Sequence, residues 1–220
     1  MAQDFSIPKT LQRTAGLLNR DKALIGPAWL IWLGAATALN VLTPSDFFIA
    51  PNILSLLVGA FFSAMLTYAA VGTYTPSLNE AASVGGRAYG PVLLVSIVSF
   101  IATMVGLVLL LLPELAAAIF LSLVVPVMMA ERPPIIDTFR RSIALIMPVF
   151  FPVLGFAVII FAPSLIAIAI ASAVIEGLFG MAVSSGAQEA SAGVISIYAS
   201  AAAYLTLTGG HGATIIDAFD

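Results

Sequence analysis

The sequence predicts an all-α, polytopic membrane helix bundle, with about six transmembrane helices and three cytoplasmic interfacial helices in one domain over residues 1–220. Three observations predict this class. Hydrophobic residues make up 61% of the chain and charged residues only 9%, whereas soluble proteins carry about 25% charged residues. Apolar runs long enough to cross a bilayer recur along the chain. All eight Lys and Arg residues fall in alternate segments between these runs.

The distribution of positive charge predicts the orientation. Basic residues occur in three stretches, which precede the first, third and fifth apolar runs: Lys9, Arg13, Arg20 and Lys22; Arg87; and Arg132, Arg140 and Arg141. The other connecting segments contain no Lys or Arg and carry Asp46, Glu114, Glu176 and Glu189. Because basic loops resist translocation, we expect an inner-membrane-type protein whose basic stretches and both termini are cytoplasmic.

The first three spans follow directly from the apolar runs. Residues 23–42 form the first predicted span, which ends at a turn-forming Thr-Pro-Ser-Asp sequence at 43–46. Residues 53–72 return to the cytoplasmic side. The stretch 74–90 is too polar to span, so the third span is predicted at 91–112, followed by a tight outer turn.

The last three spans are less regular. Residues 115–129 are short for a span, and Pro126 near their end is expected to bend the helix. The run 147–175 contains three prolines, which suits either one kinked helix or a helix plus an interfacial piece. Residues 176–189 are polar and rich in Gly and Ser, so we expect them outside. The sixth span is predicted at 190–207.

Residues 1–22 are predicted to form an interfacial helix rather than a signal peptide, because their charges continue to Lys22. This segment resembles the other two basic segments, 74–90 and 131–146. The alignable heptapeptides are LQRTAGL at 11–17, LNEAASV at 78–84 and FRRSIAL at 139–145. Each has a large apolar residue first, a small residue fourth and an aliphatic residue seventh. The spacing predicts short amphipathic helices in the membrane interface. A chance likeness and a three-fold repeat of interface helix, outgoing span and returning span are both open.

The third copy carries a family resemblance. Pro126, Glu131 and the Thr-Phe-Arg-Arg-Ser sequence at 138–142 with Leu145 resemble a bacterial pattern: a Pro near a span end, a Glu, then Ala-Leu-Arg/Lys-Arg-Ser and a Leu. That pattern is typical of the membrane domain of glycerophosphoryl diester phosphodiesterases and of related six-span membrane proteins of unknown function. Here Thr-Phe replaces Ala-Leu, and Pro133-Pro134 replaces a glycine-bearing turn. The resemblance implies a six-helix domain of the bacterial inner membrane, not a reaction.

Arginines are the first candidate site residues. Arg140 and Arg141, with Arg87 and Arg13, are predicted to contact lipid phosphates at the interface, where guanidinium groups anchor the loops. Pairing of Glu131 or Asp137 with one of these arginines is an open structural alternative. A specific phospholipid headgroup site is the functional alternative, since guanidinium binds phosphate in a bidentate fashion.

Catalytic groups are scarce. The chain has one histidine, His211, and no cysteine, so no catalytic residue, metal site or cofactor is predicted. The phosphodiesterase start sequence His-Arg-Gly of the resembled family is missing. A net charge of −3 over both faces predicts no nucleic-acid partner. The expected partners are the phospholipid bilayer and other membrane protein subunits.

Two function classes follow. The first is a non-enzymatic multi-pass protein, acting as an accessory or scaffold subunit or as a lipid-interacting membrane domain. The second is a small transporter or lipid-handling protein. This second class depends on the repeats, on Pro163 in mid-span, and on Glu114 and Glu176 as candidate ion or proton sites. Ionisable residues within the membrane often mark such sites.

The predicted topology can be tested with reporter fusions. Fusions after Gln12, Gly86 and Ile136 should be active as cytoplasmic reporters, and fusions after Asp46 and Ser184 as periplasmic ones. A cytoplasmic signal from the Ser184 fusion would contradict the six-span arrangement, because it would mean that the fifth apolar run does not cross.

Overall fold

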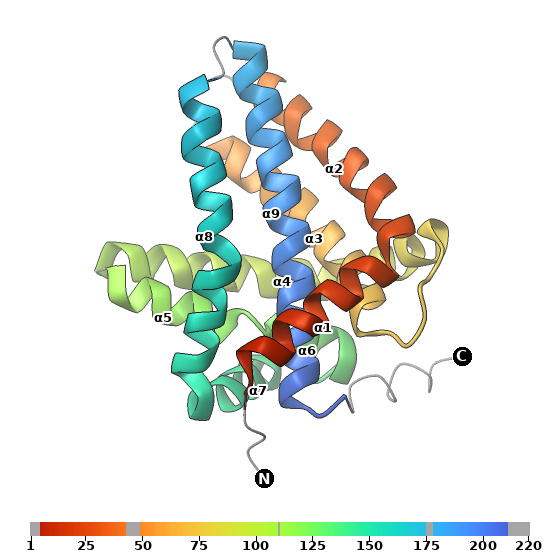
Figure 1. The fold of residues 1–220 in the computed structure, drawn as a ribbon, viewed down its shortest axis with the longest axis vertical. Coiled ribbons are helices and arrows are strands. Elements are labelled where there is room, and N and C mark those ends of the chain that lie inside the picture. Colours follow the sequence, from red (N-terminus) through yellow and green to blue (C-terminus); the bar gives the residue numbers. More distant parts are fainter. Residues whose placement is uncertain (1–4, 43–48, 110, 175–177, 211–220) are drawn as a thin grey trace.

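The computed structural model describes residues 5–42, 49–109, 111–174 and 178–210, and these residues form helices and no strand (Figure 1). The predicted all-α membrane helix bundle is confirmed. Five helical stretches are long and apolar enough to cross a bilayer: Lys22–Leu42, Ile53–Val71, Leu78–Val105, Ile135–Pro163 and Ala182–Leu207. A shorter apolar stretch, Leu115–Glu131, corresponds to the fourth predicted span.

The helices follow one another with short connections. Their bounds are α1 (Ile7–Arg20), α2 (Lys22–Leu42), α3 (Ile49–Val71), α4 (Leu78–Leu109), α5 (Leu111–Leu121), α6 (Val124–Glu131), α7 (Ile135–Ile146), α8 (Phe150–Val174) and α9 (Leu178–Leu207). A single 3₁₀ turn, Met147–Val149, joins α7 to α8. The apolar run at 147–175 thus contains one long helix, α8, with Pro163 inside it.

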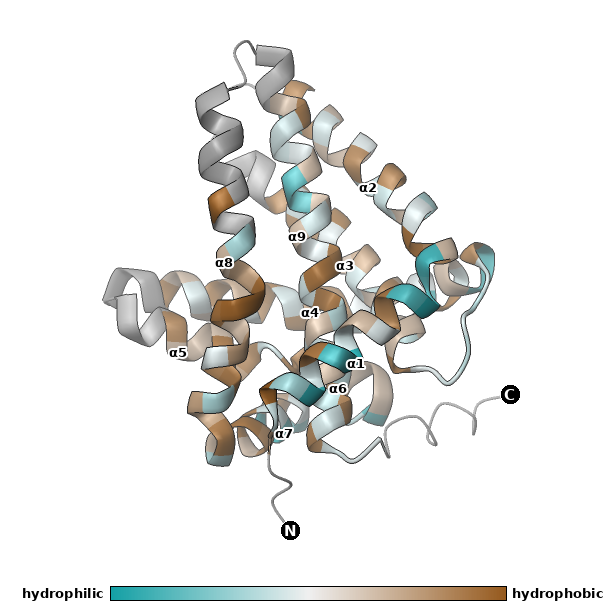
Figure 2. Cartoon of the chain, in the orientation of Figure 1, coloured by the Kyte–Doolittle hydropathy of each residue, from teal (hydrophilic) through white to brown (hydrophobic). Residues whose placement is uncertain are grey.

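The helical hairpins spread from one end of the molecule. We call this the basic end; it consists of α1, α7 and the first turns of α4, which carry Lys9, Arg140 and Arg87 respectively. Figure 1 shows α2, α8 and α9 rising from it toward the top, while α4 and α5 run across the view to the left. In Figure 2 hydrophilic residues concentrate on α1 and its neighbours at this end.

Helix α9 is the centre of the bundle. It packs against α1, α2, α3, α6 and α8, and small residues allow α2 to approach it closely. A Cβ added at Gly193 would lie 2.1 Å from the Trp32 ring, and one at Gly186 would lie 2.5 Å from the Thr37 hydroxyl. Trp32 fills the space above Gly193 and stacks on Phe62 of α3, with ring centroids 5.0 Å apart. Such small-residue packing is what brings membrane helices together where lipid gives no hydrophobic drive.

A buried ion pair joins four parts of the chain near the basic end. Asp21, between α1 and α2, is fully buried. The Arg20 guanidinium group donates hydrogen bonds to both carboxylate oxygens of Asp21, at 2.7 and 2.8 Å. Thr75 donates to the same carboxylate at 2.8 Å and Tyr198 of α9 at 3.0 Å. Arg20 also donates to the backbone carbonyl groups of Ala69 and Gly72, where α3 ends. Its hydrogen bonds with Asp21 raise the pKa of Arg20.

Two segments differ in extent from the predicted elements. The interfacial segment 74–90 was predicted to lead into a span at 91–112, and residues 78–109 form one continuous helix, α4, with Pro91 inside it. Contact with α3 supports its first turns, since Gly85 lies directly against Met65. The outer segment was expected at 176–189, but α9 begins at Leu178. Glu189 therefore lies inside a membrane-spanning helix rather than in a loop.

The fourth apolar run breaks where Pro126 predicts a bend. Helix α5 ends at Leu121 and α6 begins at Val124, because Pro126 has no N–H to donate to the carbonyl group four residues earlier. The break leaves backbone carbonyl groups that need donors. The buried Ser142 of α7 donates to the Phe120 carbonyl oxygen at 2.6 Å, so α7 is held against the break.

The predicted likeness between the first and third segments extends through the structure. Helices α7 and α8 begin 128 residues after α1 and α2 respectively. Thr10 and Thr138, which occupy matching positions just before the aligned heptapeptides, are both fully buried. Each donates its hydroxyl to the carbonyl four residues earlier. The fourth residue of the heptapeptide is also buried in all three copies: Thr14, Ala81 and Ser142.

Replacing Arg20 by Ala should lower the free energy of unfolding by about 3–5 kcal/mol, because it leaves the buried Asp21 carboxylate without its cation. Thermal unfolding in detergent measures the change. Arg140→Ala is the control: the Arg140–Asp137 pair is exposed, so its loss should cost no more than about 1 kcal/mol. Equal effects of the two substitutions would contradict the role given to Asp21.

Candidate functional site

A cavity of about 890 Å³ opens at the basic end, between α3, α4, α6 and the start of α7. This volume is in the range of small-molecule sites, about 300–1,000 Å³. Its walls combine apolar side chains with a few polar ones. The lining residues are Tyr68, Tyr74, Glu80, Val84, Arg87, Ala88, Pro91, Met128, Met129, Arg132, Pro133, Pro134 and Ile135.

The apolar wall comes from two helices that face each other. One wall consists of Val84, Ala88 and Pro91, which lie at helical spacing on one face of α4. The facing wall consists of Met128 and Met129, in the second half of α6. The methionines are mostly buried, and their flexible thioether side chains adapt to ligands of varied shape. Such a wall suits hydrocarbon rather than a polar metabolite.

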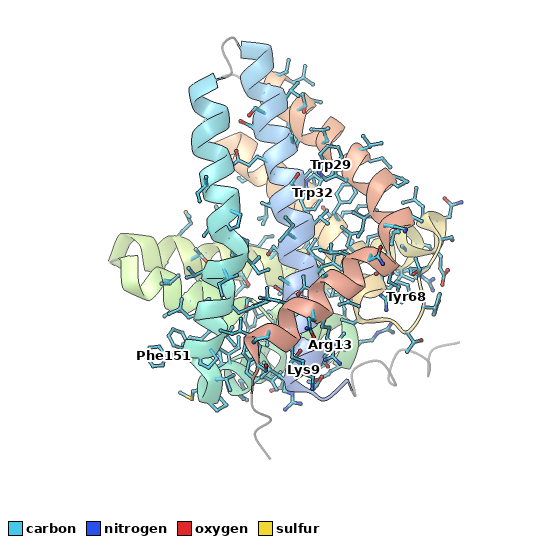
Figure 3. All side chains as sticks on the ribbon, in the orientation of Figure 1. Lys9, Arg13, Trp29, Trp32, Tyr68 and Phe151 are labelled. Atoms are coloured by element: carbon cyan, nitrogen blue, oxygen red, sulfur yellow. The ribbon has the colours of Figure 1, made fainter. Side chains whose placement is uncertain are left out.

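Tyrosines and a carboxylate form the polar side of the cavity. The Tyr68 and Tyr74 hydroxyl oxygens are 3.1 Å apart, and Tyr74 donates to Glu80. This hydrogen bond to a carboxylate raises the pKa of Tyr74, so it stays a neutral donor in ordinary conditions. Figure 3 shows Tyr68 at the right of the view, near the start of α4. The carboxylate of Glu80 is thus already engaged within the protein.

Two arginines give the cavity positive charge. Arg87 is exposed on α4, and its guanidinium group donates to Ser83 at 3.4 Å. Arg132 is at the C-terminal end of α6 with φ of 48°, the left-handed conformation that non-glycine residues rarely adopt. This turn allows Pro133 and Pro134 to follow and α7 to begin at Ile135. It also places Arg132 on the cavity wall.

The other predicted arginines lie elsewhere on the basic end. Arg141 pairs with Glu131 at 3.2 Å, and Glu131 also accepts from Tyr204 of α9. Arg140 pairs with Asp137 at 3.5 Å and keeps an exposed side chain. The pairing alternative that the sequence left open is therefore present for both. Neither residue lines the cavity with Arg87.

Arg13 neither lines the cavity nor belongs to the ion pairs of α7. Its guanidinium group donates to Thr206 near the end of α9 at 3.4 Å, and Figure 3 shows it on α1 beside Lys9. Thr206 also lies within 3.5 Å of the Thr10 hydroxyl. Arg13 thus ties α1 to α9 while its contact with lipid phosphate remains a prediction.

The predicted ion or proton sites are not described. The side chain of Glu114, in the first turns of α5, and the whole of Glu176 lie outside the described part of the chain. Within that part, no group of three or more metal-ligating side chains comes together. Glu189 is instead the carboxylate that the structure places among transmembrane helices.

Comparison with protein-family models, with curated proteins and with solved structures gives no match. The resemblance to the phosphodiesterase-associated membrane domain therefore stays a prediction, and function is argued from the geometry alone.

Sequence reasoning identified Arg87 but missed most of the cavity. Arg132 had a usable signal: helices often end with a residue in the left-handed conformation, and before Pro133-Pro134 the chain has no glycine to take that position, so Arg132 was a candidate for it. No sequence signal identified Tyr74 and Glu80, because their side chains meet only when the loop after α3 folds back on α4. Met128 and Met129 were assigned to a span, where methionine is unremarkable.

The backbone at Arg132 predicts a difference between two substitutions. Arg132→Gly and Arg132→Val both remove the guanidinium group, but only valine is strained in the left-handed conformation. The Gly variant should be more stable than the Val variant by about 1–2 kcal/mol, measured by thermal unfolding in the same detergent. Equal stability would show that this turn relaxes without cost.

Proposed function

We propose that this integral membrane protein is a non-enzymatic, lipid-interacting domain that binds an anionic phospholipid in the cavity at its basic end. The cavity carries the proposal: the apolar walls from α4 and α6 fit acyl chains, and Arg87 and Arg132, which line the same cavity, supply positive charge for a phosphate group. Guanidinium groups bind phosphate with strong, charge-assisted hydrogen bonds. The role requires no bond-making chemistry.

Position supports a lipid rather than a soluble anion. The cavity lies between the apolar part of α4, which begins near Pro91, and the basic stretches that the charge distribution predicts to be cytoplasmic. A phospholipid in the inner leaflet has its phosphate at this level and its chains directed into the bilayer. The Tyr68–Tyr74–Glu80 network adds donors and an acceptor for the polar part of the headgroup.

Arg87→Ala should reduce retention of anionic phospholipid about fivefold, equivalent to about 1 kcal/mol for one basic residue at the membrane surface. Native mass spectrometry of the detergent-purified protein, titrated with phosphatidylglycerol, measures the loss. The matched control is Arg140→Ala, which removes an exposed arginine of the basic end that does not line the cavity. Retention should be unchanged in this control. Equal losses would mean that general surface charge, not the cavity, attracts the lipid.

Filling the apolar wall tests the acyl-chain part of the proposal. Ala88→Trp should exclude bound phospholipid because the indole occupies the space between α4 and α6. Leu94→Trp is the control, since Leu94 is exposed on the same helix and outside the cavity. Unchanged binding in a folded Ala88→Trp protein would refute an acyl chain in this position.

A further inference from the structure

A carboxylate is held between three transmembrane helices, away from the cavity. Glu189 is in the first half of α9, where Figure 2 shows a hydrophilic stretch on an otherwise mostly apolar helix. The Trp32 indole N–H of α2 donates to Glu189 Oε1 at 3.4 Å. The Ser55 hydroxyl of α3 lies 3.2 Å from Oε2. Both oxygens thus have a neutral partner from a different helix.

Glu189 is partly buried, and its partners place it within the apolar part of the helix bundle. Helix α2 has 21 residues, which span about 31 Å at 1.5 Å per residue and so match the roughly 30 Å hydrocarbon core. Trp32 is the central residue of this helix, ten residues from either end. The other partner, Ser55, is near the start of the apolar stretch Ile53–Val71 of α3. The carboxylate therefore lies within the apolar length of the helices, between the middle of α2 and the N-terminal end of α3.

The surrounding packing keeps the carboxylate at this depth. Trp32 is wedged against Gly193 and stacked on Phe62, so its indole N–H has little freedom. One turn away, Trp29 donates to Ser191 at 3.0 Å; Figure 3 shows both tryptophans of α2 pointing toward α9. Glutamate also has a short side chain, which limits how far it can reach toward water.

No basic side chain neutralises Glu189 within the described part of the chain. The ion pairs seen there do not include it. Helix α2 contributes one charged residue, Lys22 at its first position, and α3 one titratable residue, Tyr68 near its end. Helix α8 has no ionisable side chain, and the next titratable group of α9 is Tyr198, bound to Asp21. Asp46, Glu114, Glu176 and His211 are not placed.

We propose that Glu189 is an intramembrane binding site for a small monovalent cation, either a proton or Na⁺. An uncompensated carboxylate is costly at membrane depth, and two neutral donors add no positive charge. A bound proton would be shared along the Oε2 to Ser55 contact, with the acid donating to the hydroxyl. Na⁺ would instead use the Glu189 and Ser55 oxygens as hard ligands. No residue of this site lines the cavity, so it is independent of phospholipid binding.

Dicyclohexylcarbodiimide tests the proposal, because it modifies protonated carboxylic acids in apolar surroundings. The acid proton moves to a carbodiimide nitrogen as the carboxylate oxygen bonds to the central carbon, and the adduct rearranges to a stable N-acylurea without a leaving group. We expect one adduct on the wild-type protein in lipid nanodiscs at neutral pH in Na⁺-free buffer. Peptide mass mapping should place it on Glu189.

Two variants and one change of the buffer cation complete the experiment. The adduct should disappear in Glu189→Gln and persist in Asp137→Asn, which removes an exposed carboxylate at the basic end that does not line the cavity. Replacing choline by Na⁺ at constant ionic strength should slow labelling if Na⁺ is the occupant and leave it unchanged if the proton is. Absence of a Glu189 adduct on folded wild-type protein in Na⁺-free buffer would overturn the proposal. So would labelling only of other carboxylates.

Discussion

The buried carboxylate of Asp21 is the interaction on which the arrangement of the helices most depends. It receives Arg20 from its own turn, Thr75 from the loop after α3 and Tyr198 from α9. Removing a charge from water is costly unless every oxygen has a partner, so these three segments must meet in one geometry for the chain to fold. Because Asp21 also separates α1 from α2, the same contact sets the angle at which the first surface helix leaves the membrane-spanning part.

Helix α9 then determines what lies inside the bundle. Its glycines and alanines let α2 and α3 approach, which is how transmembrane helices gain packing energy without a hydrophobic drive. Close approach brings Trp32 to Gly193, and the same contact places the indole N–H beside Glu189. Small residues on one face of α9 thus produce both the tightest packing in the described chain and the proposed cation site.

The two proposed sites use different physics at different depths. At the basic end, charge is solvated and arginines can attract phosphate while apolar walls accept hydrocarbon, so electrostatic and hydrophobic terms add for an amphiphile. At Glu189 the carboxylate has two neutral donors from α2 and α3, and in our proposal a bound cation balances its charge. Beyond the cavity, the α4–α5 hairpin runs to the left in Figure 1, and α4 exposes large apolar residues after Pro91, among them Leu94, Val98 and Ile101.

Composition and charge order determined the class of this protein by themselves: hydrocarbon length sets the apolar runs, and the alternation of basic segments sets the predicted orientation. The small residue at the fourth position of each amphipathic heptapeptide was visible in the sequence, and the structure shows that it is buried in all three copies, at Thr14, Ala81 and Ser142. Only tertiary structure decided that α4 continues through Pro91 and that α9 starts early enough to take in Glu189. Local polarity suggested an interfacial helix at 74–90 and an outside segment at 176–189, but contacts of α4 with α3 and of α9 with α2 extend the helices through these residues. The cavity residues Tyr74, Arg132 and Met129 come together across long sequence separations, and such contacts leave no periodic pattern in the chain.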